Sequence, residues 1–141
     1  MVMFNRYLEA DIDLEHLNFK PDLVLSNRHE ARGPLRWIAI LRDQLDVPLA
    51  ATSGVHRMQG AVKLLLAGAD VAMMASILLK NGPGTIGTIL DEMTTWLEEH
   101  EYESVEQMKG SMSQQAVAEP AAFERANYIK VLSSFDLRFA P

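Results

Sequence analysis

Two short runs of small residues stand where this sequence could hold an anion. Thr52-Ser53-Gly54 follows one apolar run, and Ala75-Ser76 follows the next apolar run along the chain. Small residues let backbone N–H groups come close to an anion, and the first turn of a helix favours negative charge. Two tight strand-to-helix connections, with Ser76 as an N-cap, explain the runs equally well. The pair of runs is more informative than either run alone.

The segments around these runs alternate between strand and helix patterns. The predicted strands cover residues 2–4, 47–51 and 70–75, and the predicted helices between and after them cover residues 34–45, 57–67 and 76–80. Gly68 has the position of a left-handed cap at the end of the second helix. This order is typical of right-handed βαβ crossovers and a parallel sheet, so the predicted fold class is α/β. Ligands of such folds lie at the carboxyl ends of the strands, where both small-residue runs are expected.

The remaining segments give weaker patterns. Residues 22–26 predict a short strand, the polar segment 7–21 predicts irregular structure, and further helices are expected at 85–100, 104–109 and 120–132. We expect a single domain over 1–141, with a C-terminal helical extension over 101–141. The pattern does not separate an open sheet from a piece of a closed barrel. In either case, three strands with helices on one side leave apolar surface uncovered.

The composition excludes several classes of protein. The chain has 141 residues, 48% of them hydrophobic, which is ordinary for one globular domain. A net charge of -6 without a Lys- or Arg-rich run argues against a nucleic-acid partner. The absence of cysteine excludes disulfides, thiolate metal sites and a cysteine nucleophile within this chain. No signal peptide and no membrane span are recognised in the sequence, so we expect a cytoplasmic protein.

Other residues with chemical potential have simpler explanations. The acidic run at 11–15 lacks the glycine and terminal glutamate of a calcium loop, and no histidines are spaced as metal ligands, so no metal site is predicted. His56 follows the first small-residue run, and a solvent-facing side chain at a helix start is favoured there. Met73 and Met74 are predicted as core residues, and Trp37 as a packing residue of the helical layer.

The same segments resemble the dihydroorotate dehydrogenase family, whose members are FMN-dependent (β/α)8 barrels. The matching segments cover residues 4–6, 33–37, 52–56, 65–71, 75–79 and 101–110. The resemblance therefore extends over nearly the whole chain. It implies the C-terminal portion of a TIM barrel, about three βα units with strands six to eight, followed by C-terminal helices.

The resemblance also implies roles for individual residues. Ser53, Gly54, Ala75 and Ser76 match the positions that hold the FMN phosphate, largely through backbone N–H groups. Asn5 matches the asparagine that hydrogen-bonds the substrate ring beside the flavin. The implied reaction, which belongs to pyrimidine biosynthesis, is oxidation of a dihydropyrimidine such as dihydroorotate. A base removes the C5 proton, hydride leaves C6 for flavin N5, and a second acceptor reoxidises the FMN.

Three features depart from the family pattern. Arg6 stands where the better-characterised members have a small hydroxyl residue, so the substrate is not fixed by the resemblance. Ser53 replaces the glycine of most members, at a cost of about 1 kcal/mol if this position needs a positive φ. The catalytic base and the flavin-contacting lysines belong to the first five barrel units, which this sequence does not contain. We therefore assign no catalytic residue and expect no dehydrogenase turnover from this chain alone.

Two functional hypotheses follow from the sequence. The first is a dihydroorotate dehydrogenase-like oxidoreductase represented by its C-terminal, FMN-phosphate-binding part, which needs the missing barrel units. The second is a non-catalytic phosphate- or flavin-binding partial barrel that acts through self-association or a partner chain. The sequence leaves the electron acceptor and the oligomeric state open.

Overall fold

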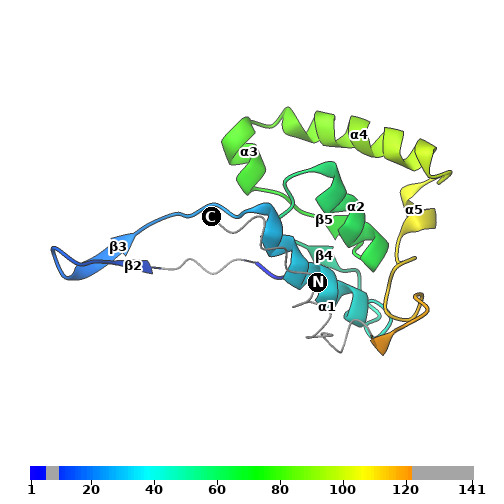
Figure 1. Cartoon of the computed structure of the whole chain (residues 1–141), viewed down its shortest axis with the longest axis horizontal. Coiled ribbons are helices and arrows are strands. Elements are labelled where there is room, and N and C mark those ends of the chain that lie inside the picture. Colours follow the sequence, from blue (N-terminus) through cyan, green and yellow to red (C-terminus); the bar gives the residue numbers. More distant parts are fainter. Residues whose placement is uncertain (6–9, 122–141) are drawn as a thin grey trace, which may run out of the picture.

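A computed structural model describes residues 1–5 and 10–121 of the chain (Figure 1). Its central sheet has three short parallel strands in the order β1-β4-β5, formed by Val2–Met3, Ala50–Ala51 and Val71–Ala72. Each strand lies within a segment predicted as a strand. The alternation of strands and helices confirms the predicted α/β class with a parallel sheet.

Helices connect the strands and cover one side of the sheet. They are η1 (Arg28–Ala31), α1 (Arg32–Leu41), α2 (Met58–Ala67), α3 (Ser76–Asn81), α4 (Thr85–Glu99) and α5 (Val105–Met108). Helix α2 lies between α1 and α4 (Figure 1). The predicted helix at 120–132 falls almost wholly outside the described residues. In the described part of the chain, no helix has both the length and the apolar character needed to cross a membrane.

The core forms where α1 and α2 pack on β4. Ile38, Leu49 and Leu64 are fully buried around Ala51, which ends β4. Full burial of a Leu or Ile side chain contributes about 1.5–3 kcal/mol relative to exposure. A second cluster lies on the other side of α2 and consists of Met58, Val62, Leu65, Ile89 and Met108. Helix α2 thus holds α1, the sheet, α4 and α5 together.

The opposite face of the sheet carries exposed apolar side chains in the described part of the chain. Val2 pairs with Ala50, and Ala50 pairs with Val71, so these residues form one row across the sheet. The side chains of Val2 and Val71 are 60% and 52% exposed. The predicted full burial of strand 70–75 is therefore wrong, and Met73 is also exposed. The expectation of apolar surface without a cover is confirmed.

Residues after β1 contain a hairpin where irregular structure was predicted. β2 (Ala10–Asp13) and β3 (Asn18–Pro21) pair antiparallel and extend away from the helical body (Figure 1). Asp13 Oδ1 accepts hydrogen bonds from the backbone N–H groups of the second and third residues after it, at 2.9 and 3.1 Å. This Asx-type turn reverses the chain between the strands. The prediction for 7–21 is therefore corrected for this part.

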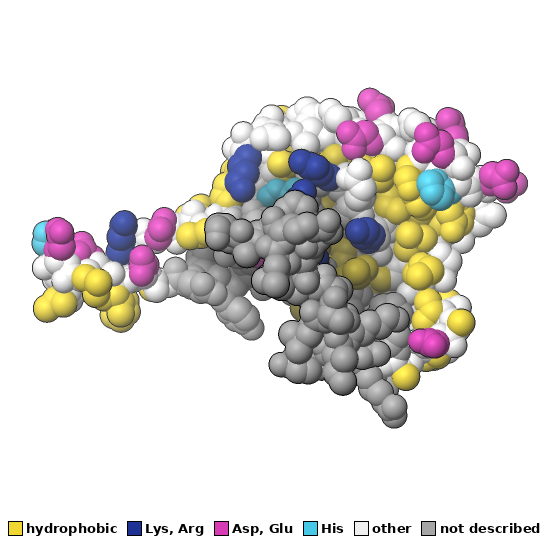
Figure 2. All heavy atoms as spheres, viewed as in Figure 1, with side chains coloured by type: hydrophobic (Ala, Val, Ile, Leu, Met, Phe, Trp, Pro, Cys, Tyr) yellow, Lys and Arg dark blue, Asp and Glu magenta, His cyan; other side chains and the backbone are white. Residues whose placement is uncertain are grey.

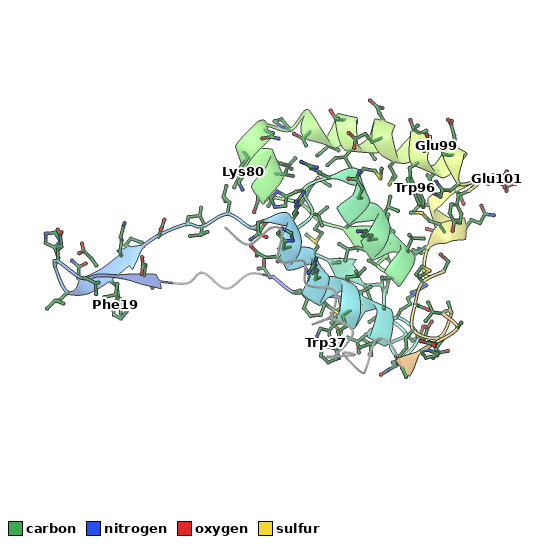
Figure 3. The ribbon with its side chains drawn as sticks, in the orientation of Figure 1. Phe19, Trp37, Lys80, Trp96, Glu99 and Glu101 are labelled. Carbon is green, nitrogen blue, oxygen red and sulfur yellow. The ribbon has the colours of Figure 1, made fainter. Side chains whose placement is uncertain are left out.

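Two smaller predictions also fail. Residues 22–26 form no strand, and Ser26 at the end of this segment is instead hydrogen-bonded to Ser76 at the start of α3. Trp37 lies on the outer side of α1, away from α2, and is 48% exposed instead of packed in the helical layer (Figure 3).

Candidate functional site

A small cavity lies at the carboxyl ends of the three parallel strands. Its volume is about 90 Å3, and we call it the strand-end cavity. Its walls come from the residues that follow β1, β4 and β5, together with one residue from the segment before η1: Asn5, Thr52, Ser53, Gly54, Val55, Met73, Met74, Ala75, Ser76 and Ser26. The structure thus brings together all five residues that the sequence singled out as site residues, Asn5 included. Whether they bind a cofactor stays a prediction.

The loop after β4 has an unusual backbone at its second and third residues. Ser53 has φ 78° and Gly54 has φ 75°, both in the left-handed region. The sequence predicts a strain cost at Ser53 only if the φ angle of this residue is positive. In the structure it is positive. The Ser53 hydroxyl donates a hydrogen bond of 2.6 Å to the carbonyl oxygen of Phe4. This bond ties the loop to the end of β1 and offsets part of the strain.

Substitution of Ser53 separates strain from hydrogen bonding. Ser53→Ala keeps the strained φ and loses the bond to Phe4, whereas Ser53→Gly loses the bond and also relieves the strain. We expect the alanine variant to be about 1 kcal/mol less stable than the glycine variant, and the glycine variant to be close to the wild type. Urea unfolding monitored by circular dichroism measures both differences. Equal stability of the two variants would show that the positive φ carries no cost.

A buried serine anchors the loop after β5. Ser26 is 5% exposed, and both its backbone N–H and its hydroxyl donate to Ser76 Oγ, at 3.1 and 2.8 Å. Ser76 is the first residue of α3, and Ala75 occupies the N-cap position, so the reading of Ser76 as an N-cap is corrected. With both acceptor positions of Ser76 Oγ used, its single O–H hydrogen is available to donate to another group.

His56 and Lys80 reach the same serine from two other elements. His56 Nε2 lies 3.0 Å from Ser26 Oγ, and Lys80 Nζ donates to the Ser26 carbonyl oxygen at 3.4 Å. Lys80 lies on α3, beside the segment that leads into α1 (Figure 3). Burial, and then the positive charge of Lys80, lower the pKa of His56 below its usual value, which favours a neutral imidazole. Because Ser26 Oγ donates to Ser76, it accepts a hydrogen bond from His56.

Sequence reasoning missed part of this arrangement. His56 is half-buried and bonded to Ser26, so the expectation of a solvent-facing side chain is wrong. Ser26 and Lys80 were not considered as site residues, and no local pattern marks them, since their contacts join segments about 50 residues apart. Arg6, which departs from the family pattern, lies outside the described residues.

Comparison with known proteins gives two significant relatives, while no known protein-family profile matches the chain. The chain is 31% identical over 104 residues to the dihydroorotate dehydrogenase (quinone) of Erythrobacter litoralis strain HTCC2594. This alignment covers 66% of this chain and 30% of that protein. It is 30% identical over 94 residues to the catalytic subunit of dihydroorotate dehydrogenase B (NAD(+)) of Pyrococcus furiosus, an alignment that covers 62% of this chain and 31% of that subunit. This chain is related to the dihydroorotate dehydrogenases.

The relationship to dihydroorotate dehydrogenases agrees with the family resemblance of the sequence. The aligned part spans less than a third of either dihydroorotate dehydrogenase. One of these two enzymes is named for a quinone and the other for NAD(+), so they do not assign an electron acceptor to this chain.

Proposed function

We propose that this chain forms the FMN-phosphate-binding part of a dihydroorotate dehydrogenase-like oxidoreductase that oxidises a dihydropyrimidine. One observation carries the proposal: the loops after β4 and β5, which match the phosphate-binding positions of the family, line one small cavity at the strand ends. In parallel α/β folds, this is the edge where ligands bind.

The size and charge of the strand-end cavity fit a phosphate group. At about 30 Å3 per water molecule in the liquid, 90 Å3 suits a small oxyanion and is too small for a flavin ring. No carboxylate lines the cavity among the described residues. Lys80 places a positive charge beside it through its bond to Ser26. A phosphate in this position would meet no repulsive group from the wall.

Hydrogen-bonding capacity also fits an anion. Ser76 Oγ accepts two hydrogen bonds from Ser26 and keeps one hydrogen to donate. Ser26 is in turn fixed by His56 and Lys80, so Ser76 is held by a network that does not need the ligand. The short side chain of Ala75 leaves room for a ligand beside the backbone. An oxyanion would accept a hydrogen bond from the Ser76 hydroxyl.

The exposed face of the sheet supports a partial barrel. In a (β/α)8 barrel, the strand face opposite the helices is the packed interior, and parallel sheets are generally covered on both faces. The row of Val2, Ala50 and Val71, in which both valines are exposed and Ala50 is half-buried, lies on this face. We propose that the further units of a barrel cover this row.

The residues of this chain would bind and orient, and would not perform the proton transfer. Bound FMN would supply the hydride-accepting ring. Ser53, Gly54, Ala75 and Ser76 would hold its phosphate, and Asn5, which lies in the wall of the same cavity, would hydrogen-bond the substrate. The general base is left to the barrel units that this sequence does not contain.

A non-catalytic role has one observation in its favour. The apolar row on the sheet could instead be covered by a second copy of the chain, with the strand-end cavity still binding a flavin phosphate. Binding of FMN is common to both roles, so it is the property to test first.

The test is a titration of the full chain with FMN and with riboflavin, which lacks the phosphate. Flavin fluorescence and absorbance report binding. Because the contacts are made to the phosphate, we expect FMN to bind at least about tenfold more tightly than riboflavin. Equal affinity for the two flavins, or no binding of FMN at millimolar concentration, would contradict the proposal.

A matched pair of variants locates the bound phosphate. Ala75→Asp places a carboxylate in the cavity wall, and we expect it to weaken FMN binding by about tenfold or more. Ala118→Asp makes the same change at an exposed residue outside the cavity, and it should leave the affinity unchanged. If both variants bind FMN alike, the phosphate is bound elsewhere.

A further inference from the structure

A second and larger cavity lies between η1, the start of α1 and α2. Its volume is about 440 Å3, and we call it the basic cavity. The basic side chains in its wall are Arg28, His29, Arg32, His56, Arg57 and Lys63. It shares only Gly54 with the strand-end cavity, so the two are different sites on either side of one residue. Neither the sequence pattern nor the family resemblance assigns a role to it.

The charge of this cavity is opposite to that of the chain. The chain carries a net charge of -6, yet four of its 13 Lys and Arg residues line this one cavity, and no Asp or Glu is among the described residues of its wall. Figure 2 shows Lys and Arg side chains around a histidine on this face of the molecule, whereas acidic side chains lie along α4 and on the hairpin. Concentrated positive charge of this kind attracts an anion.

The four cations are not used for ion pairs within the described residues. The described ion pairs involve Arg42, Lys109 and His16, none of which lines the basic cavity. The nearest carboxylate along the chain, Glu30, accepts hydrogen bonds from the backbone and side chain of Asn27 in a capping box and is not part of the cavity wall. Four positive charges in one concave site repel one another unless an anion is bound.

Two helix starts add to this potential. Arg32, the first residue of α1, and Arg57, the N-cap of α2, lie in the wall of the cavity, and each helix is ten residues long. Neither helix has a hydrogen bond from a side chain at its N-cap. The positive ends of both helix dipoles therefore lie beside the same four cations.

We propose that the basic cavity binds a small molecule with two linked phosphate groups, such as inorganic pyrophosphate or the diphosphate of a nucleotide. Four cations provide two for each phosphate, and the planar guanidinium of arginine pairs with phosphate oxygens in a bidentate manner. A concave volume of 440 Å3 lies in the usual range of about 300–1,000 Å3 for small-ligand sites, and it exceeds what one phosphate needs. The site is independent of FMN binding at the strand-end cavity.

Calorimetric titration of the full chain with inorganic pyrophosphate tests this site, with inorganic phosphate for comparison. We expect pyrophosphate to bind at least about tenfold more tightly than phosphate. The variant Arg32→Gln/Arg57→Gln should weaken pyrophosphate binding by at least about tenfold. Arg28→Gln/Lys63→Gln removes two other cations of the wall and should have the same effect, which protects the test against a folding defect in one variant.

Two controls exclude general charge effects and binding at the other site. Lys20→Gln/Arg36→Gln removes two positive charges outside the basic cavity and should change the affinity by less than about twofold. Ala75→Asp, in the strand-end cavity, should keep the affinity for pyrophosphate. The proposal is wrong if pyrophosphate binds no better than phosphate, if both double variants of the cavity retain wild-type affinity, or if Ala75→Asp abolishes binding.

Discussion

Gly54→Ala is expected to lower the free energy of unfolding by about 2–5 kcal/mol, since it combines a strained backbone with a steric clash. Gly54 has φ 75°, which an L side chain adopts only at a cost. A Cβ at this residue would also clash with the backbone nitrogen of Ala31, which is main chain and has no alternative rotamer. Either the loop after β4 or the start of α1 must move. Urea unfolding at pH 7 measures the loss.

Gly87→Ala is the matched control for this substitution. Gly87 lies inside α4, and a Cβ there would have no heavy atom within 4 Å. Since alanine favours a helix by up to about 1 kcal/mol over glycine, this variant should be slightly more stable than the wild type. If Gly54→Ala unfolds at the same urea concentration as the wild type, the loop after β4 is not closely packed against Ala31.

Asp70→Asn is expected to cost about 1.5–3 kcal/mol at neutral pH, because it replaces a charged acceptor that joins several elements. The Asp70 carboxylate accepts a hydrogen bond from the Leu49 N–H at 2.7 Å and lies 3.0 Å from Lys109 Nζ and 3.8 Å from an Arg42 nitrogen. These contacts connect the entry to β4, the end of α1 and the end of α5. Its side chain is only 20% exposed, so solvent screens these contacts incompletely.

The effect of Asp70→Asn depends on pH in a defined direction. Burial raises the pKa of Asp70, but the Leu49 N–H and Lys109 outweigh it, and the pKa is lowered from its ordinary 3.8. The folded state therefore holds this proton less tightly than the unfolded state. The stabilisation is fully present above pH 3.8 and is lost as the pH falls through the lower, folded value.

Urea unfolding of the wild type and Asp70→Asn over this pH range tests the account. The difference between them should be largest near neutral pH and should narrow in acid. Asp46→Asn, at an exposed residue, should change stability by less than about 0.5 kcal/mol. A difference between wild type and Asp70→Asn that stays constant down to strong acid would mean that the charge of Asp70 does not stabilise the fold.

The sequence predicted the site where local signals and a general rule agree. The small residues at Ser53 and Ser76 end two apolar runs, and neighbouring parallel strands place their carboxyl ends at one edge. Their positions in one cavity wall agree with this rule. The spacing itself left open whether the two loops hold an anion or only turn the chain. Gly68 has φ 115° as the left-handed cap of α2, which glycine at a helix end commonly predicts.

The sequence did not predict features that depend on distant segments. Ser26 meets Ser76 across 50 residues, and nothing near Ser26 in the chain indicates this contact. The basic cavity joins Arg28 and Arg32 with Arg57 and Lys63, which lie far from the first two in the sequence. Such groupings arise from the packing of α1 on α2 and cannot be read from periodicity.

The central claim is that the strand-end cavity binds the phosphate of FMN, and the phosphorus NMR resonance of FMN tests it most directly. During titration of FMN with the full chain, we expect a saturable shift of this resonance that Ala118→Asp retains and Ala75→Asp largely removes. A resonance that does not change at millimolar protein, or one that shifts equally with Ala75→Asp, would contradict the claim.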